Sequence, residues 1–116
     1  MKKKLDFDEI FKRTIKGLDG KNYDCLCELV KGIFVICNNN KYGIINSKGR
    51  ILAECRYDYV GCFYKHLLPV RCDGRYGFLN KDGKEIVKCK YEDFIFFNDC
   101  IKVKFNGKWK SMYLIF

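Results

Sequence analysis

Apolar and polar residues alternate along most of the chain in short runs, a pattern typical of β-strands with one buried face. Turn signals separate the runs, and Asp73-Gly74 and Asn106-Gly107 each stand between two of them. Both dipeptides favour two-residue hairpins of type I′, whose two central residues have positive φ. Asn38-Asn39-Asn40 takes the same place upstream, and asparagine also tolerates the left-handed conformation. The pattern therefore predicts a series of antiparallel hairpins.

The spacing of the runs predicts eight principal strands and two shorter extended segments. The strands are expected at residues 33–38, 41–46, 50–55, 67–72, 75–80, 84–89, 100–105 and 108–116, and the extended segments at 59–63 and 93–97. Pro69 lies within one of these strands, which predicts a sheet edge or a bulge there, because proline has no N–H to donate. Short, evenly spaced strands favour a mainly all-β fold, an antiparallel meander that forms a small roll or a partly closed barrel.

A helical pattern is confined to the N-terminal part of the chain. Apolar residues recur there at helical spacing, namely Phe7, Ile10, Phe11, Ile15 and Leu18. Asp6 followed by Glu9 matches a capping box. We therefore predict a short helix over about residues 6–17. Residues 1–22 would cap one domain whose repeats occupy residues 23–116; the alternative is that this segment is a degenerate repeat with extended structure.

The hairpins repeat at a period of 34 residues. The segment RYGFLNKDGK, residues 75–84, matches KYGIINSKGR, residues 41–50, position by position. A partial third copy begins at Lys108-Trp109, where Lys110 replaces the glycine. Tyrosine–acidic pairs recur at the same period, at Tyr23-Asp24, Tyr57-Asp58 and Tyr91-Glu92. Such a period indicates stacked supersecondary units, because one unit cannot bury its apolar face alone.

The basic–aromatic–Gly core, the Asn-x-x-Gly turn and the tyrosine–acidic pair together resemble the WG repeat family, also called KWG repeats. The resemblance covers roughly Ile33 to Trp109. The family is named for a Trp-Gly pair, whereas the two full copies here carry Tyr42-Gly43 and Tyr76-Gly77, and the single Trp has no glycine after it. The resemblance implies a β-rich interaction module without shared catalytic residues.

Composition is consistent with a folded protein. Apolar residues make up 48% of the 116 residues and aromatic residues 16%, although the formal net charge is +9. No 18-residue apolar run is present, and the N-terminal lysines lead into acidic residues instead of the apolar segment of a secretion signal. We therefore expect a cytoplasmic protein without a membrane partner. The eight cysteines lie in strand-like runs without Cys-x-x-Cys spacing, which favours reduced thiols over disulfides or a zinc site. No metal or cofactor is expected.

Basic residues recur beside the repeated aromatic residues. Such a stripe could bind phosphate groups while the rings stack on bases, so single-stranded nucleic acid or a nucleotide is one candidate ligand. The residues of this candidate site are Lys41, Tyr42, Arg50, Arg75, Tyr76, Lys84, Lys108 and Trp109. The alternative for the same positions is architectural: the ring packs across the hairpin, and the glycine lets a neighbouring strand approach.

The run Met112 to Phe116 is apolar, and an exposed apolar edge strand is prone to aggregate. We therefore expect this strand to be buried in the sheet or paired with a partner strand, including that of a second copy in a homodimer. The candidate contact residues at this edge are Met112, Leu114 and Phe116. A non-catalytic protein-interaction module is the favoured function, and binding of an anionic ligand is the alternative.

Enzymatic chemistry has little support in the sequence. His66 is the single histidine, and Cys62 lies four residues before it. A nucleophile and its base also need a third group that orients the base, and no glycine-rich phosphate loop is present. We expect a protein that is not an enzyme, with Cys–His chemistry at Cys62 and His66 as the minor alternative.

Overall fold

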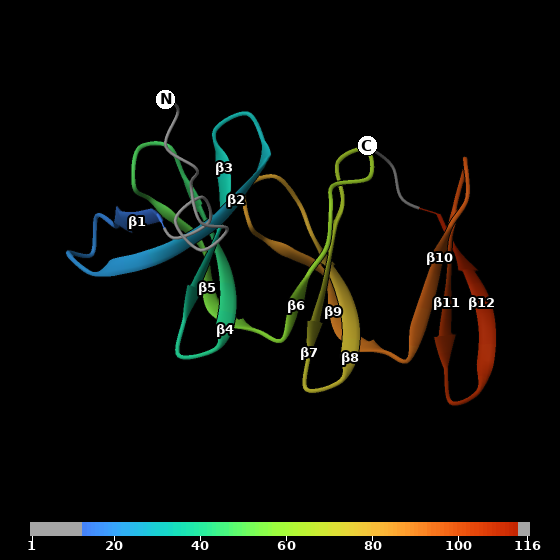
Figure 1. Ribbon diagram of the computed structural model, residues 1–116. Helices are drawn as coiled ribbons and strands as arrows, with labels where there is room; N and C mark the ends of the chain where they lie inside the picture. Colours follow the sequence, from blue (N-terminus) through green and yellow to red (C-terminus); the bar gives the residue numbers. More distant parts are fainter. Residues whose placement is uncertain (1–12, 114–116) are drawn as a thin grey trace, which may run out of the picture. The chain divides into compact units, whose positions relative to one another are not determined.

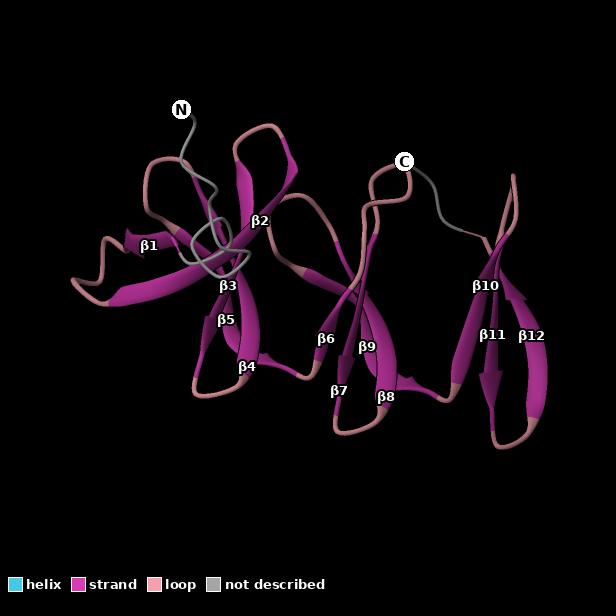
Figure 2. Cartoon of the chain, in the orientation of Figure 1, coloured by secondary structure: helices cyan, strands magenta, loops and turns pink. Residues whose placement is uncertain are grey.

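The computed structural model describes residues 13–113, which form antiparallel strands without a helix (Figures 1 and 2). The strands are β1 (Arg13–Lys16), β2 (Asn22–Val30), β3 (Ile33–Asn38), β4 (Lys41–Asn46), β5 (Ile51–Tyr57), β6 (Tyr59–Val60), β7 (Leu68–Cys72), β8 (Arg75–Leu79), β9 (Glu85–Tyr91), β10 (Asp93–Phe96), β11 (Ile101–Phe105) and β12 (Lys108–Met112). This part of the chain therefore contains no helix that could cross a membrane. The chain divides into two compact units, Met1–Arg56 and Tyr57–Phe116.

The first unit contains one sheet in the order β1-β2-β3-β4-β5. Each strand pairs with the next along the chain, so the sheet is a meander. Its core contains the buried residues Tyr23, Ile36 and Ile45, with Phe34 and Ile51 packed against them. The apolar positions that predicted alternating strands thus supply one buried layer of this sheet.

The second unit contains two sheets, in the orders β6-β7-β8-β9 and β10-β11-β12. They share a core in which Phe78 and Val103 are fully buried. The rings of Phe78 and Phe94 meet edge to face, with centroids 5.2 Å apart and planes at 82°, a favourable geometry for aromatic pairs. One face of the three-stranded sheet therefore packs on the four-stranded sheet.

One sequence period corresponds to one meander. Strands β3, β4 and β5 recur one period later as β7, β8 and β9, and β11 and β12 repeat the first two of these. The predicted all-β fold of antiparallel hairpin repeats is confirmed. The predicted closure into a roll or barrel is wrong, because the sheets are open and separate.

The predicted turns are present. Asn39 and Asn40 have φ of 52° and 63°, Asp73 and Gly74 have 52° and 79°, and Asn106 and Gly107 have 51° and 75°. These pairs of positive φ values are those of type I′ hairpins. The turn chemistry therefore fixes the register of β3–β4, β7–β8 and β11–β12.

The Asn-x-x-Gly turns are held by the asparagine side chain. Asn80 Oδ1 accepts hydrogen bonds from the N–H groups of Asp82 and Lys84, both at 3.0 Å. Asn46 Oδ1 does the same for Lys48 and Arg50. Gly49 and Gly83 close these turns at φ of 84° and 82°, which favours glycine because it has no Cβ.

The predicted N-terminal helix is wrong for the part of it that the structure describes. Arg13–Lys16 forms β1 and pairs with β2, with Ile15 opposite Tyr23. Residues 6–12 lie outside the described residues. Pairing with a neighbouring strand here outweighs the helical spacing of the apolar residues, since local propensity is a weak preference. The alternative of extended structure fits residues 13–16.

Pro69 lies in β7, which has a neighbour on each side. Its carbonyl accepts a hydrogen bond from the N–H of Gly61 at 2.9 Å, so the proline nitrogen also faces the β6 side of the strand. β6 consists only of Tyr59–Val60. Pro69 thus lies where β6 ends, a local edge at which a missing N–H costs little.

Candidate functional site

The repeated glycines have a structural role. A Cβ on Gly77 would lie 2.4 Å from the carbonyl oxygen of Val87, and one on Gly43 would lie 2.4 Å from that of Ala53. These oxygens belong to β9 and β5, the strands that follow in each meander. Glycine is required because the following strand approaches too closely for any side chain.

The tyrosine–acidic pairs also serve the scaffold. Tyr57 and Tyr91 are buried. The carboxylate after the second tyrosine, Glu92, accepts a hydrogen bond from the N–H of Gly107 at 3.0 Å, and Asp58 accepts one from the N–H of Asp73 at 2.8 Å. Each carboxylate thus satisfies a backbone donor of the type I′ turn that follows 15 residues later.

Tyr76 is packed among other side chains. Its ring meets Phe94 edge to face at 5.1 Å and Tyr59 at 6.2 Å, and the guanidinium of Arg71 lies 5.9 Å from its centre. These contacts account for a half-buried tyrosine without a ligand. Tyr42 is also half-buried, whereas Trp109 is 43% exposed.

The basic residues of the candidate anion site lie at two different ends of the sheets. Arg75 begins β8, whereas Lys84 follows the turn at its other end, and a five-residue strand spans roughly 17 Å. Lys41 and Arg50 are separated in the same way by β4. Arg75 also lies 3.9 Å from a carboxylate oxygen of Glu92. Within each unit, the predicted residues therefore do not form one continuous stripe.

β12 has a neighbour on one side only among the described residues. β4 lies between β3 and β5, and β8 lies between β7 and β9, whereas β12 pairs with β11 alone. The five cross-strand pairs from Ile101↔Met112 to Phe105↔Lys108 run without a bulge. The last sheet thus presents a regular edge at the position where the other two sheets have another strand.

The register shows which backbone groups face this open edge. The carbonyl of Lys104 accepts a hydrogen bond from the N–H of Glu92 at 2.8 Å, on the side away from β12. Its cross-strand neighbour is Trp109, so Trp109 turns its own N–H and C=O away from β11. Ser111, two residues later, does the same. Their counterparts in β8, Tyr76 and Phe78, pair with β9.

Lys110 occupies the position of the repeated glycine on β12. It lies opposite the fully buried Val103, and its Nζ is 5.9 Å from the centre of the Tyr91 ring. A strand that approached as closely as β5 approaches Gly43 or β9 approaches Gly77 would meet the lysine Cβ at this position. Any strand that pairs with β12 must therefore use a more regular geometry than β9 does.

The predicted contact residues at the C-terminal edge are placed differently from one another. Met112 is half-buried and packs against the core of the second unit, where it helps to line a cavity of about 140 Å³ with Tyr64 and Phe96. Tyr113 is 69% exposed. Leu114 and Phe116 lie outside the described residues. The sequence reasoning missed Trp109 and Ser111 as edge residues, although the loss of the glycine at Lys110 was a usable signal.

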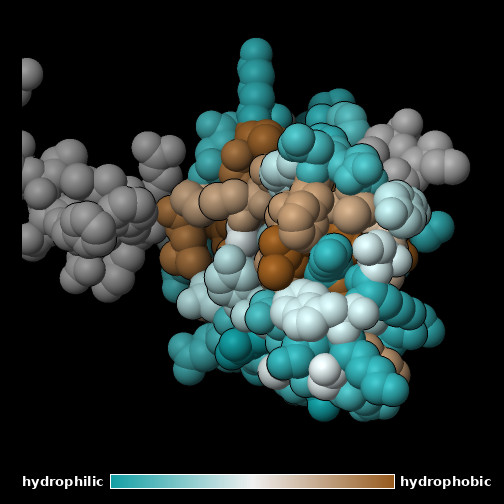
Figure 3. Space-filling model, turned by 90° about the vertical axis from the view of Figure 1, so that its right-hand side faces the viewer, coloured by the Kyte–Doolittle hydropathy of each residue, from teal (hydrophilic) through white to brown (hydrophobic). Residues whose placement is uncertain are grey.

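The surface beside β12 mixes apolar and charged side chains. Figure 3 views the molecule from this side, where hydrophilic residues surround exposed apolar ones. Ile95, Phe97 and Trp109 are each between 43% and 47% exposed. The edge therefore borders a surface on which a partner's side chains could pack.

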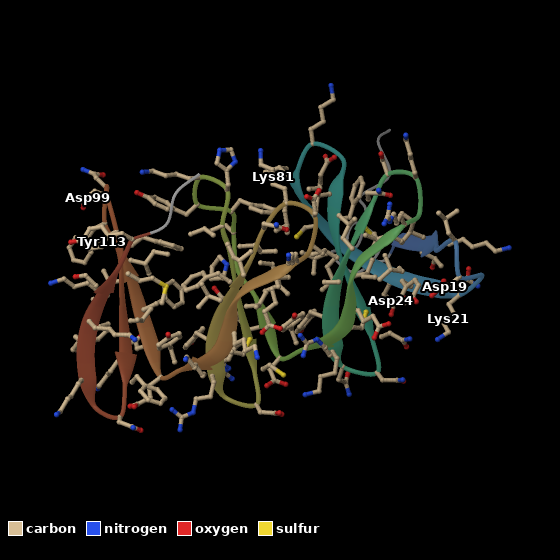
Figure 4. All side chains as sticks on the ribbon, turned by 180° about the vertical axis from the view of Figure 1, so that it is seen from behind. Asp19, Lys21, Asp24, Lys81, Asp99 and Tyr113 are labelled. Carbon is tan, nitrogen blue, oxygen red and sulfur yellow. The ribbon has the colours of Figure 1, made fainter. Side chains whose placement is uncertain are left out.

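A second hollow, of about 360 Å³, lies in the first unit beside the β1–β2 turn. The Tyr23 hydroxyl donates a hydrogen bond to Asp19, which raises the pKa of Tyr23 to about 12 and lowers the pKa of Asp19. Burial raises the pKa of the Cys55 thiol to about 11, so this thiol is a poor nucleophile near neutral pH. Figure 4 shows Asp19 and Lys21 together at the turn.

The Cys62 and His66 side chains are both exposed in the loop between β6 and β7. Lys65, between them, has a φ of 56° and donates a hydrogen bond to the carbonyl of Asn98. Residues 13–113 contain no cluster of three or more His, Cys, Asp or Glu side chains that could hold a metal ion. The hollow beside the β1–β2 turn and the loop between β6 and β7 therefore add no support for the enzymatic alternative.

Open antiparallel meanders, one per sequence period, define a β-repeat protein. Residues 42–76 and 76–109 each match the model of the WG containing repeat, and because the two matches cover more than half of the chain, the protein belongs to this family. The match boundaries fall at Tyr42, Tyr76 and Trp109, the aromatic residues that indicated the resemblance. No curated protein and no solved structure matches the chain.

Proposed function

We propose that this β-repeat protein is a non-catalytic interaction module that binds its partner by adding one of the partner's strands to β12. The observation that carries the proposal is the open, regular edge of β12, with the backbone groups of Trp109 and Ser111 directed outward. Strand addition gains affinity from main-chain hydrogen bonds and specificity from alternate side chains.

Two of the other edge strands, β6 and β9, are less suited to this role. β6 has two residues, and the β8–β9 ladder has register shifts. Short or bulged edges are common ways in which proteins prevent pairing with another chain. β12 has neither protection.

Ser111 offers a direct test of main-chain pairing. Ser111→Pro removes one outward N–H and retains the ladder to β11, because that N–H points away from β11. Peptides selected from a displayed random library on the wild-type protein should bind Ser111→Pro roughly tenfold more weakly, the effect of one lost main-chain hydrogen bond. Ser111→Ala keeps the N–H and should bind like wild type.

The two variants should have the same circular dichroism spectrum and unfolding temperature, which separates binding from folding. Hydrogen exchange supplies a second readout, since the amides of Trp109 and Ser111 should become protected when peptide binds. A selected peptide that binds both variants equally well, or a library that yields no binder, would contradict strand addition at β12.

A further inference from the structure

The β11–β12 hairpin is strongly basic. Residues 101–112 contain four lysines and no acidic residue, namely Lys102, Lys104, Lys108 and Lys110. The corresponding positions of the β7–β8 hairpin are Pro69, Arg71, Arg75 and Gly77, with Asp73 in the turn. Positive charge is thus concentrated in the hairpin that has the open edge.

These lysines lie on both faces of the hairpin. Lys108 and Lys110 are opposite Phe105 and Val103, on the face that packs on the neighbouring sheet. Lys102 and Lys104 are opposite Ser111 and Trp109, on the other face. A strand added about 4.8 Å from β12 would have Lys108 and Lys110 beside it on one face, whereas Lys102 and Lys104 would lie one strand further away on the other face.

The contacts of two of these lysines are with aromatic rings. Lys110 Nζ lies 5.9 Å from the centre of the Tyr91 ring, and Lys102 Nζ lies 5.4 Å from that of Phe97. Arg75, in contrast, has the carboxylate of Glu92 at 3.9 Å. The lysines near the open edge therefore differ from Arg75 in having room for a carboxylate from outside the chain.

A second copy of β12 would be a poor occupant of this edge. Antiparallel pairing of β12 with itself, centred on Lys110, would place two Lys110 side chains opposite each other, and like charges at such a position destabilise the pair. In this register the lysines oppose self-association, and they favour a strand of opposite charge.

We propose that the partner strand is acidic, with carboxylates opposite Lys108 and Lys110 and an aromatic or aliphatic residue between them opposite Trp109. The β8–β9 pair supports the middle position, because Tyr91 lies opposite Tyr76, the counterpart of Trp109. This inference rests on the proposed function, since it specifies the partner of the same edge.

The test uses a fluorescent peptide, Thr-Val-Glu-Tyr-Glu-Val-Thr, and two matched peptides in which both glutamates are replaced by glutamine or by lysine. Anisotropy titrations with the full protein should show roughly tenfold tighter binding of the acidic peptide than of the glutamine peptide, from two cross-strand charge pairs. The difference should shrink as salt is added, because salt screens exposed charges.

Charge reversal supplies the matched variant. The Lys108→Glu/Lys110→Glu protein should prefer the lysine peptide over the acidic one, whereas Lys16→Glu, a lysine of the first unit, should leave the order unchanged. Ser111→Pro should weaken binding of the acidic peptide roughly tenfold, and Ser111→Ala should not. This pattern would show that binding depends on main-chain pairing as well as on charge.

The outcomes separate the two proposals. Equal binding of the acidic and glutamine peptides, with sensitivity to Ser111→Pro, overturns the acidic partner and leaves strand addition intact. If the acidic peptide binds Ser111→Pro as tightly as wild type, the protein has a basic surface that binds anions, and both proposals are overturned. The same follows if a thymidine oligonucleotide binds more tightly than the acidic peptide and its affinity is also unchanged by Ser111→Pro. Failure of all three peptides also overturns both, and the lysines then serve only to protect the edge.

Discussion

Gly77 and Lys110 occupy the same position in successive repeats but have opposite surroundings. The backbone of β9 fills the space in front of Gly77, where a Cβ would lie 2.7 Å from the nitrogen of Cys89. No described strand lies beside Lys110 on the open side of β12. The residue type at this position therefore reflects whether a following strand packs against it.

Alanine substitution at the two positions should have different effects. Gly77→Ala should lower the free energy of unfolding by about 1–3 kcal/mol, because the new methyl group forces β8 and β9 apart. Lys110→Ala should change it by no more than about 0.5 kcal/mol. Urea unfolding of both variants measures the difference, and equal destabilisation would show that the close approach of β9 is not what requires glycine.

Several residue roles could be predicted from the sequence and others could not. The positive φ at Asp73-Gly74 and Asn106-Gly107 followed from turn chemistry, which acts within four residues. The hydrogen bond from Gly107 to Glu92 could not be predicted, because it depends on how two strands approach each other. The edge-facing groups of Trp109 and Ser111 likewise required the cross-strand register.

At the scale of elements, β1 and β2 show how pairing overrides a local pattern. Ile15 belonged to a helical apolar series, yet it faces Tyr23 across a ladder. Asn22–Val30 forms one strand of nine residues, which was not predicted because no matching hairpin signal precedes it. Strands 33–38 and 41–46, in contrast, were predicted to the residue because the turn between them is strongly marked.

The β1–β2 hairpin should depend on pH through Tyr23. Its pKa is raised from 10.0 to about 12, chiefly because its hydroxyl donates to Asp19 and secondly because it is buried. The folded hairpin therefore favours the protonated phenol, and this contribution is fully present below pH 10.0 and is lost as the pH rises through about 12. The lowered pKa of Asp19 gives a contribution that is lost as the pH falls below 3.8.

Asp19→Asn should lower the pKa of Tyr23 toward its ordinary value, as measured by NMR of labelled tyrosine rings during a pH titration. Asp24→Asn, a change of an exposed carboxylate next to Tyr23, is the matched control and should leave the value near 12. A Tyr23 pKa that does not respond to Asp19→Asn would exclude the hydrogen bond as its main cause.

For the molecule as a whole, the period predicted the architecture more fully than any single motif did. It gave the number of copies and the antiparallel meander, because each copy carries the same turns. It did not give the openness of the sheets, since closure depends on strand tilt and pairing across copies, which similar hairpins satisfy in several ways. The cytoplasmic location remains a prediction.

No disulfide joins the eight cysteines, all of which lie within residues 13–113, so no covalent cross-link restricts the unfolded chain. The unfolding temperature should therefore be the same with and without a reducing agent, and the unfolded protein should react with thiol reagents at all eight positions. A lower thiol count in freshly prepared protein, restored by reduction, would contradict this expectation.

The lysine at position 110 has a consequence for how such arrays could be lengthened. A duplication that added a further copy of the period after β12 would supply a strand that approaches as closely as β5 and β9 do, and this strand would meet the side chain of Lys110. Reversion to glycine would then have to accompany the duplication. Position 110 is therefore a useful place to begin when designing longer versions of this array.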